Sequence, residues 1–378
     1  MASSYLFAGG GTGGHLYPGI AVARAIARRD PDARIAFLTT DRPLDHDLLE
    51  REGFAQVPQP VRPFSPKPWH WPRFWLAWRS AIELAGEVIR NDRPRAVLGL
   101  GGYAAAPPVV AAHRAGVATA ILNQDAKPGR ANRYLAKYAR LIALQWEASR
   151  THFAPGAPCQ ALGCPIRSDF ASPKAAAARA RLGLDAARPL LLATGASQGA
   201  RTINEALLQV WPAFAAQNPA WQLLHLTGPA DEERIRDAYR AAGVLRSAPE
   251  AAPSGSVVVL GYAHDMADCL AAADAVIARA GASTLAELTA LGKPGVLFPY
   301  PYLKDRHQDF NADVLVGAGA AIKIDDARDA AQNAGPLRAA LQRLSDEKTR
   351  GAMSAAARAL GRIDAADAIA DWMMRQAD

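Results

Sequence analysis

The chain has 378 residues, half of them hydrophobic and 21% charged, with a formal net charge of +7. This length exceeds what one compact core accommodates and is ordinary for two, so the sequence predicts a globular protein of two domains. The positive charge favours anionic partners, namely phosphorylated ligands, acidic lipids or nucleic acid, without choosing among them.

Residue spacing argues against several classes of protein. The three cysteines form neither a CxxC pair nor a disulfide framework, which indicates a reducing compartment. Two DxD-like stretches, 30–32 and 45–47, are predicted to be solvated loop or helix-end residues, and metal-site spacing is absent. The longest nearly uncharged run, 96–112, is broken by glycines and prolines, so no membrane-spanning helix is expected.

Short apolar runs alternate with helical patterns along the chain. Residues 3–10 are typical of a buried strand, 17–29 of a helix and 33–40 of a second strand, which together make one βαβ unit. Further strands are predicted at 95–102, 118–124, 139–145, 189–194, 221–228, 256–262, 274–281 and 294–300. Such alternation gives parallel sheets with right-handed crossovers.

The strands fall into two series, which predicts two Rossmann-like domains joined near 163–169. We expect the first domain over 1–165 and the second over 166–350. The helices of 351–378 are expected to pack back on the first domain.

The first glycine-rich stretch, GGGTGGHLYPG at 9–19, follows the first strand and opens the first helix. Such a turn lets backbone approach a ligand, and the helix start attracts negative charge. Gly9, Gly11 and Gly14 also fit the GxGxxG pattern of dinucleotide folds, with Asp41 as the ribose-binding acid. A tight turn without ligand is the third interpretation. His15 suits proton transfer, although a structural histidine is an alternative.

Two later stretches have the same arrangement, a turn of small residues between a predicted strand and a helix. TGASQGAR at 194–201 offers Ser197, Gln198 and Arg201 as polar groups beside a glycine turn. RAGASTLAEL at 279–288 is either a capped helix start or a helix start that receives a diphosphate, with Glu287 accepting hydrogen bonds from a ribose. All three stretches follow predicted strands, where open α/β sheets bind ligands.

Together with GGYAAAPPVVAA, GCPIR and PYLKDRHQDFNA, these stretches resemble the MurG family of peptidoglycan glycosyltransferases over nearly the whole chain. The resemblance implies an α/β GT-B fold, two Rossmann-like domains facing a cleft, an acceptor and membrane domain first and a UDP-sugar donor domain second. It also implies inverting transfer of N-acetylglucosamine from UDP-N-acetylglucosamine to O4 of the muramyl sugar of undecaprenyl-diphospho-MurNAc-pentapeptide (lipid I), which forms lipid II.

The resemblance also implies roles for individual residues. His15 matches the general base, and Thr12, Gly13 and Gly14 match the loop near the donor sugar and the acceptor diphosphate. The donor is expected to contact Arg167, Ser197, Ala263, Ala282, Ser283, Thr284, Leu285, Ala286, Glu287 and Gln308. Within this set Ala263 faces uracil, 282–287 hold diphosphate and ribose, and Gln308 reads the sugar hydroxyls.

Expected partners follow from the same resemblance. They are UDP-N-acetylglucosamine as donor substrate, lipid I at the membrane surface, anionic phospholipid and a cell-wall synthesis complex, with no nucleic acid. No cofactor and no metal are expected. The expected location is the cytoplasmic face of the bacterial inner membrane, as a peripheral protein.

Two positions depart from the family pattern. Asp125 stands where a ligand-binding asparagine is usual, and a carboxylate accepts hydrogen bonds but cannot donate them and repels a diphosphate. We expect Asp125 to lie on the sugar side or to share the base role with His15. Cys164 replaces a common asparagine, which bears on specificity unless it is harmless drift.

The stretch 64–79 is rich in aromatic and basic residues. Such a surface suits the headgroup region of a membrane, where indole rings partition and basic side chains meet anionic lipid. The expected membrane and acceptor patch consists of Lys67, Trp69, Trp71, Arg73, Phe74, Trp75 and Trp78. The alternatives are a helix whose aromatic side chains fill the core and, less favoured, stacking on single-stranded nucleic acid.

Functions of three kinds account for parts of this pattern. A membrane-associated UDP-sugar transferase explains both glycine-rich halves, His15, Glu287 and the aromatic stretch. A dinucleotide oxidoreductase explains only the first loop. A non-catalytic sugar-nucleotide-binding protein explains the donor site but does not need His15. Other GT-B transferases with lipid or natural-product acceptors, and UDP-N-acetylglucosamine epimerases, are the nearest competing enzymes.

Overall fold

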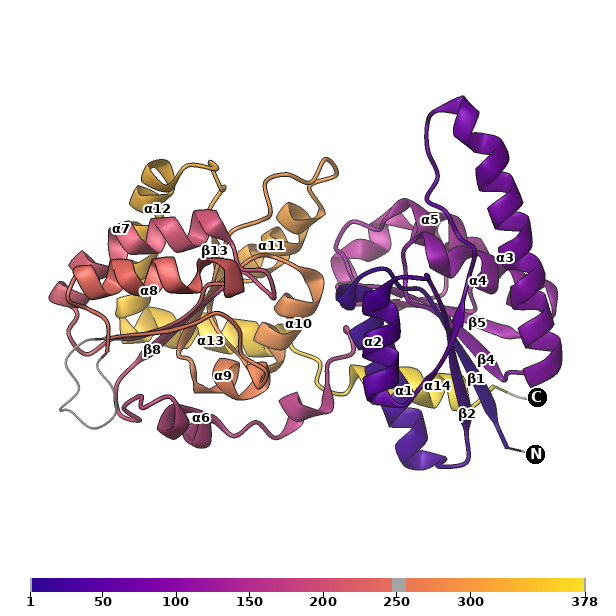
Figure 1. Cartoon of the computed structure of the whole chain (residues 1–378). Helices are drawn as coiled ribbons and strands as arrows, with labels where there is room; N and C mark the ends of the chain where they lie inside the picture. The colour runs from indigo at the N-terminus through magenta and orange to yellow at the C-terminus, as the bar shows by residue number, and fades with distance from the viewer. Residues whose placement is uncertain (1, 247–255, 377–378) are drawn as a thin grey trace. The chain divides into compact units, whose positions relative to one another are not determined.

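The computed structural model describes residues 2–246 and 256–376. The chain divides into two compact units: unit 1 comprises Met1–Ser168 and Arg362–Asp378, and unit 2 comprises Asp169–Gly361 (Figure 1). Each unit is a parallel sheet covered by helices on both faces, as the alternation of strands and helices predicts.

Unit 1 contains a seven-stranded sheet in the order β3-β2-β1-β4-β5-β6-β7. Its strands are β1 (Ser4–Ala8), β2 (Arg34–Thr39), β3 (Ala55–Pro58), β4 (Ala96–Gly99), β5 (Ala118–Asn123), β6 (Leu141–Leu144) and β7 (Cys159–Ala161). Its helices are α1 (Gly13–Arg29), α2 (Pro43–Glu52), α3 (Trp71–Asp92), α4 (Ala106–Arg114), α5 (Arg130–Leu135) and α14 (Ala365–Met374). The strand order reverses between β1 and β4, which is where doubly wound sheets bind ligands.

Both faces of this sheet are buried, which explains why its central strands are continuous apolar runs. All five residues of β1 are buried, and Phe7 stacks on Phe37 of β2 with ring centroids 4.7 Å apart. One face packs on α1, α2 and α14, and the other on α3 and α4.

Unit 2 contains a six-stranded sheet in the order β10-β9-β8-β11-β12-β13, which reverses between β8 and β11. Its strands are β8 (Leu190–Thr194), β9 (Gln222–Leu226), β10 (Val257–Leu260), β11 (Ala275–Ala278), β12 (Gly295–Leu297) and β13 (Ala321–Lys323). Its helices are α6 (Ala175–Arg181), α7 (Arg201–Gln217), α8 (Glu232–Ala241), α9 (Met266–Ala272), α10 (Ala282–Ala290), α11 (His307–Gly317), α12 (Ala330–Ser345) and α13 (Glu347–Leu360). Helices α7, α8 and α12 supply much of the buried core.

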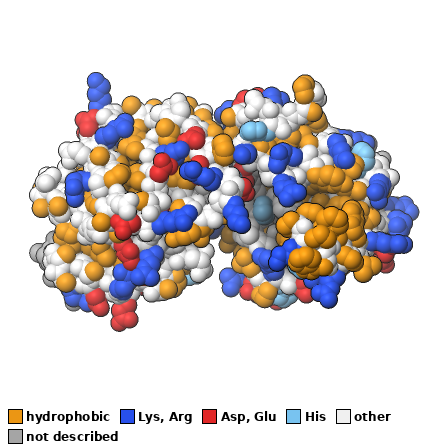
Figure 2. Space-filling model, turned by 90° about the horizontal axis from the view of Figure 1, so that it is seen from above, with side chains coloured by type: hydrophobic (Ala, Val, Ile, Leu, Met, Phe, Trp, Pro, Cys, Tyr) orange, Lys and Arg blue, Asp and Glu red, His pale blue; other side chains and the backbone are white. Residues whose placement is uncertain are grey.

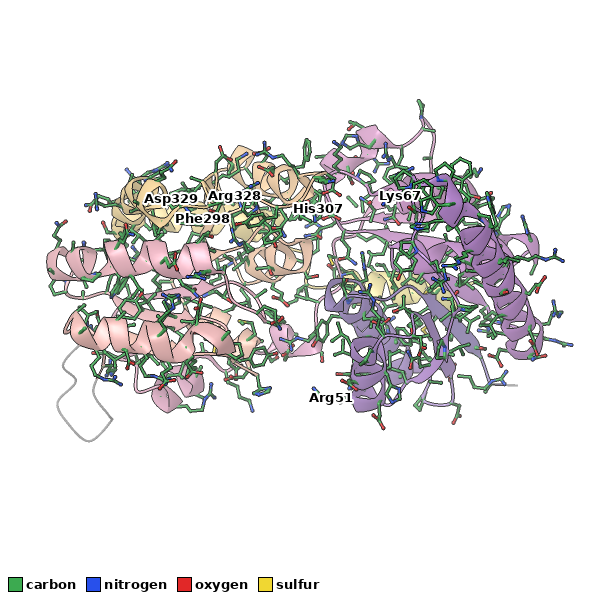
Figure 3. All side chains as sticks on the ribbon, turned by 45° about the horizontal axis from the view of Figure 1, so that its top comes forward. Arg51, Lys67, Phe298, His307, Arg328 and Asp329 are labelled. Atoms are coloured by element: carbon green, nitrogen blue, oxygen red, sulfur yellow. The ribbon has the colours of Figure 1, made fainter. Side chains whose placement is uncertain are left out.

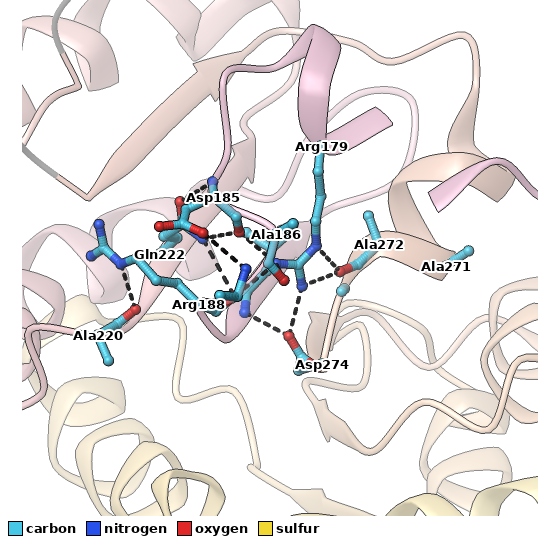
Figure 4. A network of polar contacts seen from close by, with 12 residues as sticks. Arg179, Asp185, Ala186, Arg188, Ala220, Gln222, Ala271, Ala272 and Asp274 are labelled. Carbon is cyan, nitrogen blue, oxygen red and sulfur yellow. Dashed lines mark hydrogen bonds and ion pairs between the residues drawn. The ribbon is translucent and has the colours of Figure 1, made fainter. Parts of the chain in front are cut away.

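A polar network fixes the start of β8 (Figure 4). Arg179 of α6 donates to the carbonyls of Arg188 and Ala272, both at 2.7 Å, and to Asp274 at 2.9 Å. Asp274 also accepts from the backbone N–H of Leu190 at 2.8 Å. The network therefore ties α6, the first strand of unit 2 and the segment before β11 together.

The unit boundaries differ from the prediction. Unit 1 extends to residue 168 rather than 165. The segment 351–378 is divided, because α13 stays in unit 2 and only the residues from Arg362 onward belong to unit 1. The apolar face of α14 joins the same core cluster as α1, and Arg29 forms ion pairs with Asp367 and Asp371.

Candidate functional site

The glycine-rich turn of unit 1 connects β1 to α1 and presents His15. Helix α1 begins at Gly13 with Thr12 at its N-cap, and the Thr12 side chain does not cap the helix. Instead, Thr12 Oγ1 lies 3.1 Å from His15 Nδ1. The Thr12 hydroxyl is therefore within hydrogen-bonding distance of the imidazole and orients the ring.

The second glycine pair of unit 1 makes room for this imidazole. Gly101 and Gly102, after β4, have φ values of +100° and +71°. A Cβ at Gly101 would lie 3.3 Å from His15 Cδ2, and one at Gly102 would lie 3.5 Å from Cε1. Buried Asn132 of α5 also lies near Gly101. His15 is thus held at the point where the strand order reverses.

Asp45 holds the glycine-rich turn in place by accepting a hydrogen bond from its backbone. Its carboxylate is fully buried and accepts the Gly11 N–H, at 2.9 Å to Oδ1 and 2.8 Å to Oδ2, and the Thr40 hydroxyl at 2.5 Å. The prediction that 45–47 is solvated is therefore wrong for Asp45. Because a carboxylate occupies the Gly11 N–H, the turn is poorly suited to the pyrophosphate that GxGxxG loops bind. Asp41, the predicted ribose acid, lies in an exposed position after β2.

Asp125 lies after β5, at the same edge of the sheet as the His15 turn, and is half-buried. The Asn123 side chain donates to the backbone carbonyl of Asp125 at 2.9 Å, and the Asn132 side chain donates to the side-chain oxygen of Asn123 at 3.2 Å. These contacts fix the loop that carries the Asp125 carboxylate.

Unit 2 has a pocket of about 680 Å³ at the carboxyl ends of β8 and β11. Its wall includes Ser197, Thr284 and Gln308, three of the predicted donor contacts, whereas Ala263 and Glu287 are not part of it. The other lining side chains include Arg201, Arg279, Tyr300, Tyr302 and Arg328. Arg328 lies on the loop before α12 (Figure 3).

A buried ion pair supports this pocket. Arg279 donates to Asp326 at 2.6 Å, and the Asp326 side chain is fully buried. Thr202 and Asn333 donate to the same carboxylate at 2.6 and 2.9 Å. Burial raises the pKa of Asp326, but these hydrogen bonds outweigh burial and hold that pKa below its ordinary value. The Arg279 guanidinium is therefore fixed, with its centre 5.6 Å from the Tyr300 ring centroid.

The third glycine stretch opens α10, which begins at Ala282 with Gly281 at its N-cap. Ser283 and Thr284 thus lie in the first turn rather than at the cap, so the capping-box interpretation is wrong. Leu285 and Ala286 are buried, and Glu287 lies in the second turn rather than the first. Gln308 lies in the first turn of α11, and its Oε1 accepts the Tyr300 N–H at 2.9 Å. This bond directs the Gln308 amide nitrogen away from Tyr300.

Family models match both halves of the chain. The glycosyltransferase family 28 N-terminal domain matches residues 5–144, and the family 28 C-terminal domain matches residues 190–369. The chain belongs to glycosyltransferase family 28. The predicted fold class, two Rossmann-like domains of the GT-B type, is therefore confirmed.

Two relatives named for the same activity match most of this chain and confirm its resemblance to the MurG family. A protein of Desulforudis audaxviator named UDP-N-acetylglucosamine–N-acetylmuramyl-(pentapeptide) pyrophosphoryl-undecaprenol N-acetylglucosamine transferase is 38% identical over 97% of this chain and 96% of its own length. A protein of Prosthecochloris aestuarii with the same name is 39% identical over 85% of each chain.

Solved structures share the fold. MurG of Acinetobacter baumannii superposes with a TM-score of 0.76 at 23% identity, covering 99% of both chains. The UDP-GlcNAc 2-epimerase of Neisseria meningitidis, bound to UDP-GlcNAc, gives a TM-score of 0.67 at 10% identity over 99% of this chain and 100% of its own. At these identities the likeness establishes architecture alone.

The remaining predicted residues lie as follows in the family 28 fold. Arg167, predicted for the second domain, belongs to unit 1, where its guanidinium lies 5.8 Å from the Tyr17 ring centroid of α1. Ala263 is buried after β10. Cys164 is buried. Among the described residues, none of the helices combines the length and apolarity needed to cross a bilayer, and no three potential metal ligands cluster.

The aromatic stretch forms the projecting N-terminal end of α3 with the short helix η1 (Pro68–His70) before it. Exposed fractions are 68% for Trp69, 43% for Trp71 and 59% for Trp75, whereas Phe74 and Trp78 are half-buried. Figure 2 shows an exposed hydrophobic cluster on unit 1 with Lys and Arg side chains around it. Trp78 packs against the core, so the core interpretation holds for that end of the stretch only.

Sequence reasoning missed several residues that build these sites. Gly101 and Gly102 were visible as a second glycine pair after a strand, which is the signal that identified the first turn. Asp45, Arg279 and Asp326 gave no local signal, because their roles depend on contacts between residues 34 and 47 positions apart.

Proposed function

We propose that this protein transfers N-acetylglucosamine from UDP-N-acetylglucosamine to O4 of the muramyl sugar of undecaprenyl-diphospho-MurNAc-pentapeptide, with inversion at the anomeric carbon. The observation that carries the proposal is the 38% identity, over 97% of the chain, to a relative named for this activity. The two glycine-turn sites, one in each unit, support it.

In this proposal unit 2 holds the donor. The pocket lined by Ser197, Thr284 and Gln308 has a helix start, guanidinium groups and tyrosine rings, a combination suited to a sugar diphosphate. The Gln308 amide nitrogen donates to a sugar hydroxyl. Ala263 and 282–287 complete the contacts to uracil, diphosphate and ribose, with Glu287 accepting from the ribose.

Unit 1 supplies the base in this proposal. His15 Nε2 takes the proton from O4 as that oxygen attacks the anomeric carbon, and UDP departs with the bonding electron pair. Thr12 orients the ring, and backbone N–H groups of Gly13 and Gly14 stabilise anionic oxygens. Asp125 accepts a hydrogen bond from a sugar hydroxyl or helps His15 hold the proton. Arg167 contributes positive charge to the diphosphate.

The exposed part of the aromatic stretch is proposed to rest on anionic lipid at the cytoplasmic face of the inner membrane. Lys67, labelled in Figure 3, supports this. Its ammonium lies 5.7 Å from the Trp69 ring centroid, and both side chains are exposed. Replacing Trp69 and Trp75 by Ala is expected to reduce co-sedimentation with anionic vesicles, while Trp211→Phe, in the core, serves as the comparison.

The function is tested by incubating the purified protein with UDP-N-acetylglucosamine radiolabelled in the sugar and a lipid I analogue. Transfer of label to the analogue is expected. Calorimetry with UDP-N-acetylglucosamine and with NADH distinguishes the transferase from the dinucleotide oxidoreductase, because only the oxidoreductase is expected to bind NADH. Donor binding without transfer would show a binding-only protein and overturn the proposal.

The role of Asp125 has its own test. Asp125→Asn is expected to alter turnover, and an unchanged turnover and pH profile would exclude that role.

A further inference from the structure

Unit 1 contains an open pocket of about 680 Å³ that lies beside the His15 turn but is separate from it. It lies between the loop after β3 and the first half of α3. We call it the arginine groove, after three of its lining residues: Arg42, Arg62 and Arg73. The apolar part of its wall comes from Val61, Leu76 and neighbouring prolines.

The charge of the arginine groove favours an anionic ligand. Asp41 is the only acidic residue among the described residues that line it, against three guanidinium groups. Arg42 donates to the Gly11 carbonyl at 2.9 Å, and within 2–246 and 256–376 no ion pair engages Arg62 or Arg73. Guanidinium groups in this state bind carboxylates or phosphates well.

The wall that carries Arg62 is stiff. Pro60 and Pro63 flank this residue, and proline both fixes its own φ and restricts the residue before it. Little conformational entropy is therefore lost when a ligand binds to this wall.

Gln59 distinguishes between kinds of anion. Gln59 lines the groove but is only 3% exposed, and its Nε2 donates to the Ala104 carbonyl at 3.2 Å. The amide orientation is thereby fixed, and Oε1 has no hydrogen-bond partner. A buried acceptor without a donor is costly, so the groove favours a ligand that brings N–H groups as well as negative charge. A peptide has both, whereas an ionised diphosphate has no donor.

The groove also adjoins the proposed base. One rim is tied to the His15 turn through Arg42 and Gly11, and the other includes Tyr103, next to the Gly102 that faces His15. A ligand whose reacting hydroxyl lies at His15 can therefore extend into the groove within unit 1.

We infer that the arginine groove binds the peptide of the acceptor, an inference that rests on the proposed function. Peptide carboxylates pair with Arg62 and Arg73, and a peptide N–H donates to Gln59 Oε1. The groove is then an acceptor-recognition site separate from the one that holds the reacting sugar.

The test compares three acceptors in the transfer assay: one with its pentapeptide, one with the peptide carboxyl groups amidated, and one without peptide. Arg62→Gln is expected to raise KM for the peptide-bearing acceptor roughly tenfold, with kcat within about twofold, since a charge-assisted hydrogen bond is lost. KM for the other two acceptors stays unchanged. Arg90→Gln, at the far end of α3 and outside the groove, is the matched control.

An equal rise in KM for all three acceptors would mean that the groove binds the diphosphate, and no rise would mean that it binds no part of the acceptor. Either result overturns the inference. Calorimetry with soluble pentapeptide at millimolar concentration adds an arm that needs no turnover. Peptide binding by the wild type and its loss in Arg62→Gln would support the groove even if sugar transfer failed. Transfer with unchanged KM values and no peptide binding would leave the function intact and reject the groove.

Discussion

The imidazole of His15 lies directly against Gly101, so that a Cβ at position 101 would be 3.3 Å from ring atom Cδ2 and 3.4 Å from Nε2. The side chain at position 101, two residues after the end of β4, therefore decides whether the proposed base keeps its position.

Gly101→Ala is expected to lower kcat roughly tenfold or more, because the added methyl group displaces the ring from its reacting position. The substitution also strains the backbone, since φ is +100°. Gly116→Ala is the matched control: its φ is +77°, but a Cβ there meets no atom within 4 Å. Steady-state kinetics and thermal unfolding of both variants separate the two effects. Equal loss of turnover in both variants would contradict the role of the contact.

Removal of the base and of its orienting hydroxyl should have different kinetic signatures. His15→Gln is expected to lower kcat by about 10²–10⁴-fold and to abolish the acid limb of the pH profile. Thr12→Val, which keeps the shape but removes the oxygen 3.1 Å from Nδ1, should shift that limb and lower kcat less. Donor binding by calorimetry should stay near the wild-type value in both. An unchanged pH profile in His15→Gln would show that another group takes the proton.

Asp45 and Asp47 lie two residues apart in α2 and provide a comparison within one helix. Asp45→Asn replaces a buried carboxylate that accepts the Gly11 N–H and the Thr40 hydroxyl, so we expect a loss of about 1–3 kcal/mol in stability and a fall in turnover. Asp47 is exposed, and Asp47→Asn should change neither. Chemical denaturation and turnover measured on both variants check this. Similar behaviour of the two would remove Asp45 as the anchor of the turn.

The stability of unit 2 should depend on pH through His225 of β9. Burial lowers the pKa of this fully buried side chain to about 3, and its ring nitrogens contact Tyr239 and Asn204 at 3.2 and 3.0 Å. The unfolded chain takes up the proton near pH 6.5 and the folded chain does not, so the stabilisation is complete above pH 6.5 and is lost as pH falls toward 3. At pH 4.5 the loss amounts to about 2–3 kcal/mol.

His225→Gln should therefore flatten the fall in unfolding free energy between pH 7 and pH 4.5, whatever its stability at pH 7. His264→Gln, in an exposed position of the same unit, should leave the slope unchanged. Denaturant titrations at a series of pH values provide the measurement. The same slope in wild type and His225→Gln would exclude this histidine as the source.

The central strands of both sheets were predictable because they are continuous apolar runs, such as the five buried residues of β1. The edge strands β3, β7 and β13 were not predicted, because they are short and only partly buried. The order of strand, turn and helix pattern also placed His15, Ser197 and Thr284 at strand ends. Asp45 was not predictable, since an acid near a helix start is normally solvated and only the fold brings the Gly11 N–H to it. The division of the C-terminal helices between the units was missed for a similar reason: α13 and α14 are both amphipathic, and sequence pattern does not tell which sheet each one covers.

The position of α14 has a consequence for the order of folding during synthesis. Its Ala366, Ile369, Ala370 and Met373 belong to the core cluster of unit 1, yet they follow the whole of unit 2 in the chain. Unit 2 is contiguous in the chain and has all its residues by Gly361. Unit 1, which is translated first, is thus completed after unit 2, and part of one face of its sheet stays exposed to chaperones until α14 has been translated.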